Sequence, residues 1–158
     1  MTIKFTAIGT IHTPHKIKEG MPIQSISAKG IKGRIELKEE YLDGLLDLDG
    51  FSHIILIYHF HKSVGYKLQV KPFLDDKLHG VFSTRAPKRP NAIGMSVVKL
   101  ISVKGNSLEI ENVDMIDGTP LLDIKPYVPE FDIHKIEKGG WIEKKTGKLN
   151  DMKSDNRF

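Results

Sequence analysis

Short stretches in which apolar and polar residues alternate, broken by glycine and proline, most constrain the fold of this chain. Ile35 and Leu37 alternate with charged neighbours, and residues 3–13 begin with the same alternation. A period of two residues is typical of strands with one buried face. Residues 51–60 are almost continuously apolar, which predicts a central strand. The pattern therefore favours an all-β protein.

The remaining segments fit the same class. Residues 39–48 carry apolar side chains at helical spacing and predict one short helix. Many short strands, frequent turns and so little helix predict an antiparallel β-barrel or sandwich with one or two short helices, and no Rossmann sheet. The other expected strands are residues 66–70, 80–83, 95–103, 108–113 and the segment that begins at Leu121.

Length and composition suit one intracellular domain. A chain of 158 residues can bury one hydrophobic core, and it has no cysteine for disulfides or thiolate metal sites. Without an apolar run of about 18 residues, we expect a cytoplasmic protein with no membrane segment. Residues 131–158 are charged and predict a C-terminal appendage that ends in a frayed tail at 149–158. Within it, Trp141 is either a packing anchor or a base-stacking residue.

The segment 80–100 joins two expected strands through a cationic loop. Pro87 and Pro90 stiffen this loop. A rigid cluster of positive charge indicates an anionic ligand such as phosphate or carboxylate, although a solvated basic surface is the alternative. Residues 77–108 contain no Asp or Glu, and their basic residues are Lys77, Arg85, Lys88, Arg89, Lys99 and Lys104.

Histidines suggest a rival chemistry. His59 and His61 lie two residues apart in an expected strand, so both side chains leave the same face and could share a metal ion. His53 or His79 would have to supply a third ligand through the fold. The alternative is that they are hydrogen-bonded histidines of a core or pocket.

Residues 116–127 form a second candidate for chemistry. An Asp-Gly pair at 117–118 predicts a tight turn that leaves backbone groups available to a ligand. Asp123 lies between apolar neighbours, and partial burial would suit an acid or a base. Lys125 would project from the same face of an extended segment, so an internal ion pair is the simpler interpretation.

The basic segment, GVFSTRAPKRPNAIGMS, closely resembles the signature of the TrmO-type tRNA methyltransferases, small β-barrel enzymes that use S-adenosylmethionine. Three further blocks resemble that family in the same order: IGTIHTPH, FSHIILIYHFH and DGTPLLDIKPYVP. The resemblance selects the barrel and implies a methyltransferase domain at 1–130, followed by the extension at 131–158. It also implies a homodimer whose cofactor lies at the barrel rim near the dimer interface, and methylation of N6 of threonylcarbamoyladenosine beside the tRNA anticodon.

The resemblance also assigns residues. It implies a reaction centre of Arg85, Asp123 and Tyr127. Ile23 and Lys62 depart from bacterial relatives, which carry Arg and Gln there. The implied cofactor-binding residues are Gln24, Ser25, Ile26, His61, Lys62, Arg85, Leu100, Asp117, Gly118, Thr119 and Pro120.

The implied chemistry needs a base, because an N6 nitrogen attached to a carbonyl is a poor nucleophile. Asp123 is the candidate base, and Tyr127 would orient it or the acceptor. Arg85 would hold the carboxylate of either the threonyl group or the cofactor, while Lys88 and Arg89 would contact RNA phosphates. No metal is expected. The two alternatives are a noncatalytic, basic RNA-binding barrel and a histidine-metal hydrolase.

Overall fold

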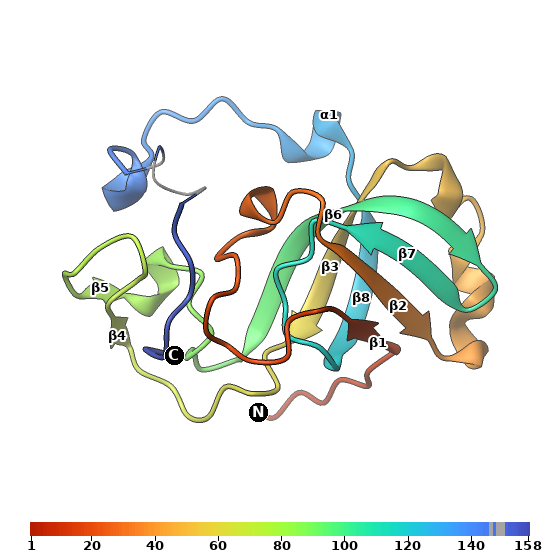
Figure 1. The fold of residues 1–158 in the computed structure, drawn as a ribbon, viewed down its shortest axis with the longest axis horizontal. Helices are drawn as coiled ribbons and strands as arrows, with labels where there is room; N and C mark the ends of the chain where they lie inside the picture. Colours follow the sequence, from red (N-terminus) through yellow and green to blue (C-terminus); the bar gives the residue numbers. More distant parts are fainter. Residues whose placement is uncertain (146, 148–150) are drawn as a thin grey trace.

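An antiparallel barrel organises the computed structural model, which describes residues 1–145, 147 and 151–158. Within these residues, six strands close the barrel in the order β1-β2-β7-β6-β3-β8, and β4 pairs with β5 in a separate two-stranded sheet (Figure 1). The expected all-β class and barrel are confirmed. The strands are β1 (Gly9–His12), β2 (Lys32–Leu37), β3 (His53–His59), β4 (Gln69–Val70), β5 (His79–Gly80), β6 (Ile93–Lys104), β7 (Ser107–Glu111) and β8 (Thr119–Pro126).

Little helix accompanies the strands in the described part of the chain. The short helix α1 (Pro129–Asp132) follows β8 directly. No described helix has the length and hydrophobicity that a membrane span requires. The 3-10 helices are Ser25–Ser27, Glu39–Leu45, Leu48–Gly50, Val81–Ser83 and Gly140–Ile142.

The core fills the barrel because every strand turns alternate side chains inward. In β3, Ile54, Leu56 and Tyr58 are buried, whereas the residues between them face outward and are only half-buried. Several core side chains are completely covered; they include Ile11, Ile35, Leu108, Ile110 and Leu121. Burial of each such side chain contributes about 1.5–3 kcal/mol to folding.

Gly94 of β6 lets an aromatic ring fill the barrel beside it. Gly94 pairs with Tyr58 in the β3–β6 register. A Cβ at this position would lie 2.3 Å from Tyr58 Cε2 and 2.8 Å from Phe60 Cζ. The two rings pack edge to face with centroids 5.4 Å apart. Glycine is therefore required here by packing, and the ring of Tyr58 occupies the space that a side chain would take.

Three local expectations were wrong. Residues 3–7 form no strand; β1 starts at Gly9, opposite Leu37, the last residue of β2, so earlier residues have no strand to pair with. The expected helix at 39–48 is replaced by two 3-10 helices. The expected strands at 66–70 and 80–83 shrink to the two-residue β4 and to β5 with a 3-10 turn after it, because they pair only with each other.

The C-terminal extension crosses the molecule. It leaves the end of β8, passes over the barrel and descends beside β4 and β5, where the C-terminus lies (Figure 1). Phe158 is buried against Val70, Val81 and Ala86, and Lys153 forms a β-bridge with Pro22. The described residues 151–158 therefore pack against the body, contrary to the expected fraying. Residues 149 and 150 of the expected tail lie outside the described part.

Candidate active site at the rim of the barrel

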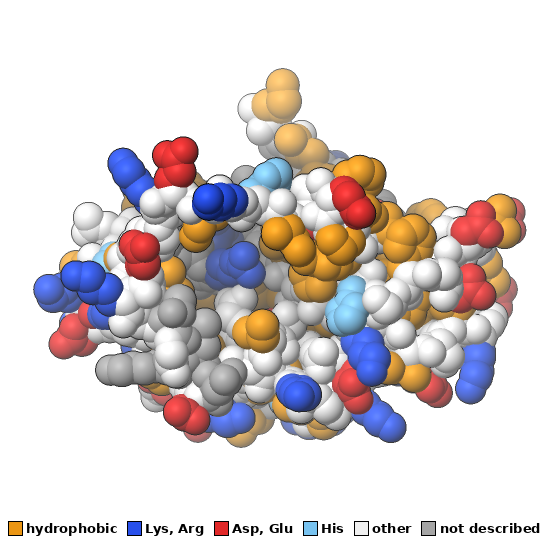
Figure 2. Space-filling model, turned by 90° about the horizontal axis from the view of Figure 1, so that it is seen from above, with side chains coloured by type: hydrophobic (Ala, Val, Ile, Leu, Met, Phe, Trp, Pro, Cys, Tyr) orange, Lys and Arg blue, Asp and Glu red, His pale blue; other side chains and the backbone are white. Residues whose placement is uncertain are grey.

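A cavity of about 1150 Å³ lies between the outer face of β6 and the long connections beside the barrel. Outward-facing Ile93 and Met95 of β6 form part of one wall, and the extension contributes Trp141 and Phe158. Figure 2 shows a hollowed face of the molecule on which hydrophobic and basic side chains surround the depression. Pockets for drug-sized ligands usually measure about 300–1000 Å³, so this cavity has room for a cofactor and part of a second ligand.

The cavity gathers most of the residues that the sequence assigned to the cofactor, although they come from separate loops. The loop before the first 3-10 helix, the end of β3, the basic loop and the start of β8 all meet here. The assigned residues that line the cavity are Gln24, Ser25, Ile26, His61, Lys62, Arg85 and Thr119, together with the expected RNA contact Arg89.

Arg85 joins two of these loops. Its Nη1 donates a hydrogen bond to Gln24 Oε1 at 3.1 Å, and its side chain is exposed. Arg89 holds the basic loop in shape, because its Nη1 donates to the carbonyl oxygens of Thr84 at 3.2 Å and Ala86 at 3.3 Å. The loop therefore presents Arg85 from a braced backbone, and Arg89 has a structural role that the sequence did not reveal.

Polar groups at the end of β3 face the same cavity. Burial, followed by the positive charge of Lys62, lowers the pKa of His61. The hydroxyl of Thr119 lies 3.5 Å from His61 Nδ1 and donates to the carbonyl of Ile116 at 2.6 Å. Ser63 Oγ is buried and has no hydrogen-bond partner among the described residues. A buried hydroxyl without a hydrogen-bond partner is unfavourable.

Asp114 is the functional candidate that sequence reasoning missed. Its carboxylate Oδ1 accepts a hydrogen bond of 2.6 Å from Ser96 Oγ. Ser96 has one hydroxyl proton and gives it to Asp114, so the Tyr58 hydroxyl, 2.9 Å from Ser96, donates to Ser96 in turn. Burial raises the pKa of Tyr58, which keeps its proton available for this bond.

The Asp114 carboxylate also reaches the ligand-facing loops. The backbone N–H of Ser25 donates to it, and Arg85 interacts with it electrostatically. Burial nevertheless dominates and raises the pKa of Asp114 to about 6. A partly desolvated carboxylate in a cavity wall is typical of functional sites. The sequence held one signal for it, an acidic residue between the apolar residues Val113 and Met115.

Several assigned residues do not line this cavity. Asp117 accepts hydrogen bonds from Thr13 N at 2.9 Å and Lys16 Nζ at 2.6 Å; the Lys16 bond, followed by the Thr13 bond, lowers the pKa of Asp117. Its visible role is thus to fix the loop after β1. Leu100 is packed in the barrel core. The other residues outside the cavity lining are Gly118, Pro120, Lys88, Asp123 and Tyr127.

Asp123 lies along β8, away from the cavity. It forms the ion pair that the sequence offered as an alternative, with 2.6 Å between Asp123 Oδ2 and Lys125 Nζ. The exposed fraction of its side chain is 46%, so the expected partial burial is slight. Tyr127 follows the end of β8, where its backbone N–H donates to the carbonyl of His53 at 3.2 Å and its ring meets the His53 ring edge-on.

The histidines do not converge. His61 lines the cavity, whereas His79 donates to Asp75 at 3.0 Å and His53 lies beside Ser52. Across residues 1–145, 147 and 151–158, no group of three or more His, Asp or Glu side chains is arranged to hold a metal ion. The metal hydrolase thus lacks the third ligand that it requires within that part of the chain.

Comparison with known proteins adds a family to this geometry. Residues 10–133 match the family model described as the tRNA-methyltransferase O N-terminal domain. A Pyrococcus abyssi protein named "Probable S-adenosyl-L-methionine-binding protein" is 52% identical over 158 residues, covering 100% of this chain and 86% of that protein.

Relatives named as enzymes are longer than this chain. The mouse tRNA (adenine(37)-N6)-methyltransferase is 39% identical over 132 residues, which cover 79% of this chain and 31% of the mouse protein. The crystal structure of TrmO from Pseudomonas aeruginosa superposes with a TM-score of 0.75 at 35% identity, covering 89% of this chain and 63% of that one. The chain therefore spans less than two thirds of these two relatives.

Proposed function

The chain belongs to the tRNA-methyltransferase O N-terminal domain family, and from this premise we propose that it is an S-adenosylmethionine-dependent tRNA methyltransferase. We further propose that its acceptor is N6 of threonylcarbamoyladenosine next to the anticodon. The observation that carries the proposal is the cavity at the barrel rim, which gathers residues of three of the four family blocks and of the loop at 24–26 around Arg85. We also propose that it acts on this substrate in the cytoplasm.

The donor set of the cavity fits S-adenosylmethionine. Arg85 and Asp114 place opposite charges in one wall, which suits the carboxylate and ammonium groups of a methionine moiety. Phe60, Met95 and other apolar side chains offer a surface for an adenine ring. When bound, the cofactor supplies an electrophilic methyl group on its sulfonium.

Asp123 and Tyr127 require a second copy of the chain to reach such a ligand. Thr119, at the start of β8, lines the cavity, and Asp123 lies four residues further along the strand, about 13 Å away at the usual rise per residue. The barrel is closed, so β8 cannot bend toward Arg85. We therefore propose a homodimer in which Asp123 and Tyr127 of one copy complete the cavity of the other.

In this arrangement Asp123 removes the proton from N6 while Tyr127 orients it or the acceptor. In the structure described here, the Asp123 carboxylate forms a 2.6 Å ion pair with Lys125. Lys88 and Arg89 place positive charge along the RNA backbone, and the acceptor base leaves its stack to enter the cavity. Arg85 holds one carboxylate, that of the cofactor or that of the threonyl group.

A comparison of two substitutions tests whether Asp123 acts as the base. Asp123→Asn should lower the methylation rate about 100-fold or more with little change in cofactor affinity, since asparagine keeps the shape but accepts no proton. Lys125→Met is the matched control, because it breaks the same ion pair and leaves the base. If Asp123 were only an ion-pair partner, the two variants would lose stability and activity equally.

Mixing Asp123→Asn with Arg85→Ala then locates the residues. If one site draws Arg85 and Asp123 from different copies, subunit exchange creates mixed dimers with one intact site, and about a quarter of the parent activity returns. No recovery in a mixture that has exchanged subunits would contradict the shared site. Calorimetry with S-adenosylmethionine addresses the alternative of a noncatalytic RNA-binding barrel, which predicts no heat of cofactor binding.

A further inference from the structure

The indole ring of Trp141, on the extension, is held in a fixed orientation in the cavity wall. Its indole Nε1 donates to the carbonyl oxygen of Ser83 at 2.8 Å, at the entrance to the basic loop. One face of the ring stacks on His79, with centroids 4.3 Å apart and planes 26° from parallel. Two independent contacts thus fix both the position and the tilt of the indole.

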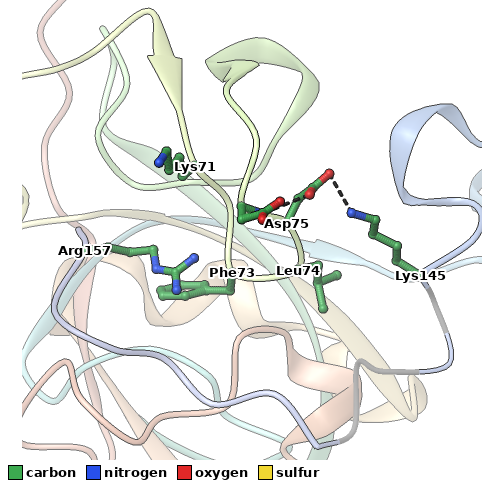
Figure 3. Close-up of a pocket in the computed structure, with 7 residues that line it drawn as sticks. Lys71, Phe73, Leu74, Asp75, Lys145 and Arg157 are labelled. Atoms are coloured by element: carbon green, nitrogen blue, oxygen red, sulfur yellow. Dashed lines mark hydrogen bonds and ion pairs between the residues drawn. The ribbon is translucent and has the colours of Figure 1, made fainter.

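A polar cluster holds His79, the residue on which the indole ring stacks. His79 Nε2 donates to Asp75 Oδ2 at 3.0 Å, and Lys145 Nζ lies 2.6 Å from the same oxygen. The hydrogen bond from Lys145, followed by that from His79, lowers the pKa of Asp75, so the carboxylate stays ionised and keeps both partners. Figure 3 shows Lys145 pointing at Asp75 on one side of a smaller cavity, with Arg157 over the ring of Phe73 on the other.

The indole ring of Trp141 lines the cavity at the barrel rim. Because His79 covers one face of the indole, a ligand in the cavity can stack only on the other. Phe82, at the same wall, has a side chain that is 76% exposed. Arg85 and Arg89 lie on the loop that follows. Aromatic rings interleaved with cations are the usual platform for unpaired nucleotides, which stack on the rings and place phosphates on the cations.

The cofactor has its own part of the cavity. Apart from Arg85, which reaches Gln24 from the basic loop, the residues assigned to it come from the loop at 24–26, the end of β3 and the start of β8, whereas Trp141 is bound to Ser83 and His79 at β5. At about 1150 Å³ the cavity exceeds what one cofactor of this size fills. Space therefore remains beside Trp141 for a base of a second ligand.

We propose that Trp141 is a stacking site for one unpaired base of the RNA substrate, adjacent to the nucleotide that is methylated. This inference rests on the proposed tRNA methyltransferase function. The extension thereby contributes to substrate binding through a residue beyond the stretch that matches the family model.

Fluorescence can test the stacking directly, because the chain contains one tryptophan. A synthetic anticodon stem-loop RNA should quench the emission of Trp141 at saturation, since a base stacked on the indole provides a route for de-excitation. S-adenosylmethionine alone should leave the emission nearly unchanged. Quenching by S-adenosylmethionine alone to the same extent would show that the adenine of the cofactor stacks on the indole ring, and it would overturn the proposal.

Binding of the same RNA to variants provides the second readout. Trp141→Ala should weaken RNA binding about fivefold to 100-fold, Trp141→Phe should weaken it less, and neither should change cofactor affinity. Phe131→Ala is the matched control, because Phe131 is an aromatic residue of the extension that is 73% exposed and lies outside the cavity. Its RNA affinity should match that of the parent.

The outcomes separate the two proposals. If the RNA binds the parent but neither quenches Trp141 nor loses affinity in Trp141→Ala, the stacking site is wrong and the methyltransferase proposal stands. If the parent binds no RNA in a separate anisotropy measurement, the proposed function itself fails and this inference fails with it. Melting curves confirm that each variant compared is folded.

Discussion

Replacing Asp114 with asparagine should stabilise the protein at neutral pH and weaken its binding of the cofactor. Burial raises the pKa of Asp114 from 3.8 to about 6. A difference of about two pKa units, at about 1.4 kcal/mol each, means that ionising this carboxyl in the folded protein costs up to about 3 kcal/mol above pH 6. Asparagine has one acceptor oxygen where the carboxylate has two, so Ser96 or Ser25 loses a partner, at about 1 kcal/mol. The net gain should be about 1–2 kcal/mol.

The pH dependence shows the direction in which Asp114 changes the free energy of unfolding. Between about pH 4 and pH 6, Asp114 has lost its proton in the unfolded chain but retains it in the folded protein, so the folded state binds more protons. The stability of the parent therefore falls as pH rises through this window, relative to Asp114→Asn. Below about pH 4 the carboxyl is protonated in both states, and above about pH 6 it is ionised in both, so the difference is constant there.

Denaturant unfolding at several pH values measures this difference. Asp43→Asn is the matched control, because Asp43 is exposed on a 3-10 helix and should change neither stability nor ligand binding. Calorimetry should show that Asp114→Asn binds S-adenosylmethionine about tenfold or more weakly, since a charged hydrogen-bonding group is lost. A variant that is less stable at pH 7, or a stability difference that does not vary with pH, would show that Asp114 stabilises the fold through Arg85 and would refute this reasoning.

Two further substitutions follow from the fold and the basic loop. Gly94→Ala should lower the free energy of unfolding by about 1–3 kcal/mol in denaturant titrations, because its Cβ would meet the Tyr58 ring, whereas Gly44→Ala, with nothing within 4 Å, should be neutral; equal effects would contradict the packing argument. Lys88→Glu should weaken tRNA binding and flatten its salt dependence by at least about one unit of slope without changing cofactor affinity, and Lys104→Glu, on the far end of β6, should have a smaller effect. Loss of cofactor affinity in Lys88→Glu would place that residue in the small-molecule site.

The barrel strands could be predicted because alternation reports burial directly. Ile35 and Leu37 alternate with charged residues, and both are buried in β2. Residues 3–7 alternate equally well but form no strand. Their alternation says which face would be apolar, and the missing information is where the neighbouring strand ends. Strand length depends on a partner distant in the sequence, which a local pattern cannot contain.

The candidate site could be predicted where a loop carries its own chemistry. Arg85 belongs to a proline-stiffened cationic loop, and it does line the cavity. Asp114 was missed because a single acidic residue between apolar ones looks like an ordinary strand end until Ser96 and Tyr58 are placed beside it. Trp141 was left between two interpretations, since its neighbours His79 and Ser83 come from a segment about 60 residues away.

Asp123 and Tyr127 show a different limit of prediction from the sequence. The sequence motif groups them with Thr119, but a strand separates these residues in space by its own rise, and only Thr119 reaches the cavity. Whether two residues of one motif share a site depends on the assembly. In the proposed dimer, Asp123 and Tyr127 of one copy reach the cavity of the other. Complementation between the Asp123 and Arg85 variants tests this arrangement.

Mass spectrometry of tRNA nucleosides tests the central claim most directly. The protein is incubated with S-adenosylmethionine and tRNA that carries threonylcarbamoyladenosine beside the anticodon, and the tRNA is then digested. We predict that the modified adenosine gains the mass of one methyl group, and that Arg85→Ala abolishes the gain. Unchanged nucleosides in a sample whose protein binds both the cofactor and the tRNA would contradict the claim that this chain is a tRNA methyltransferase.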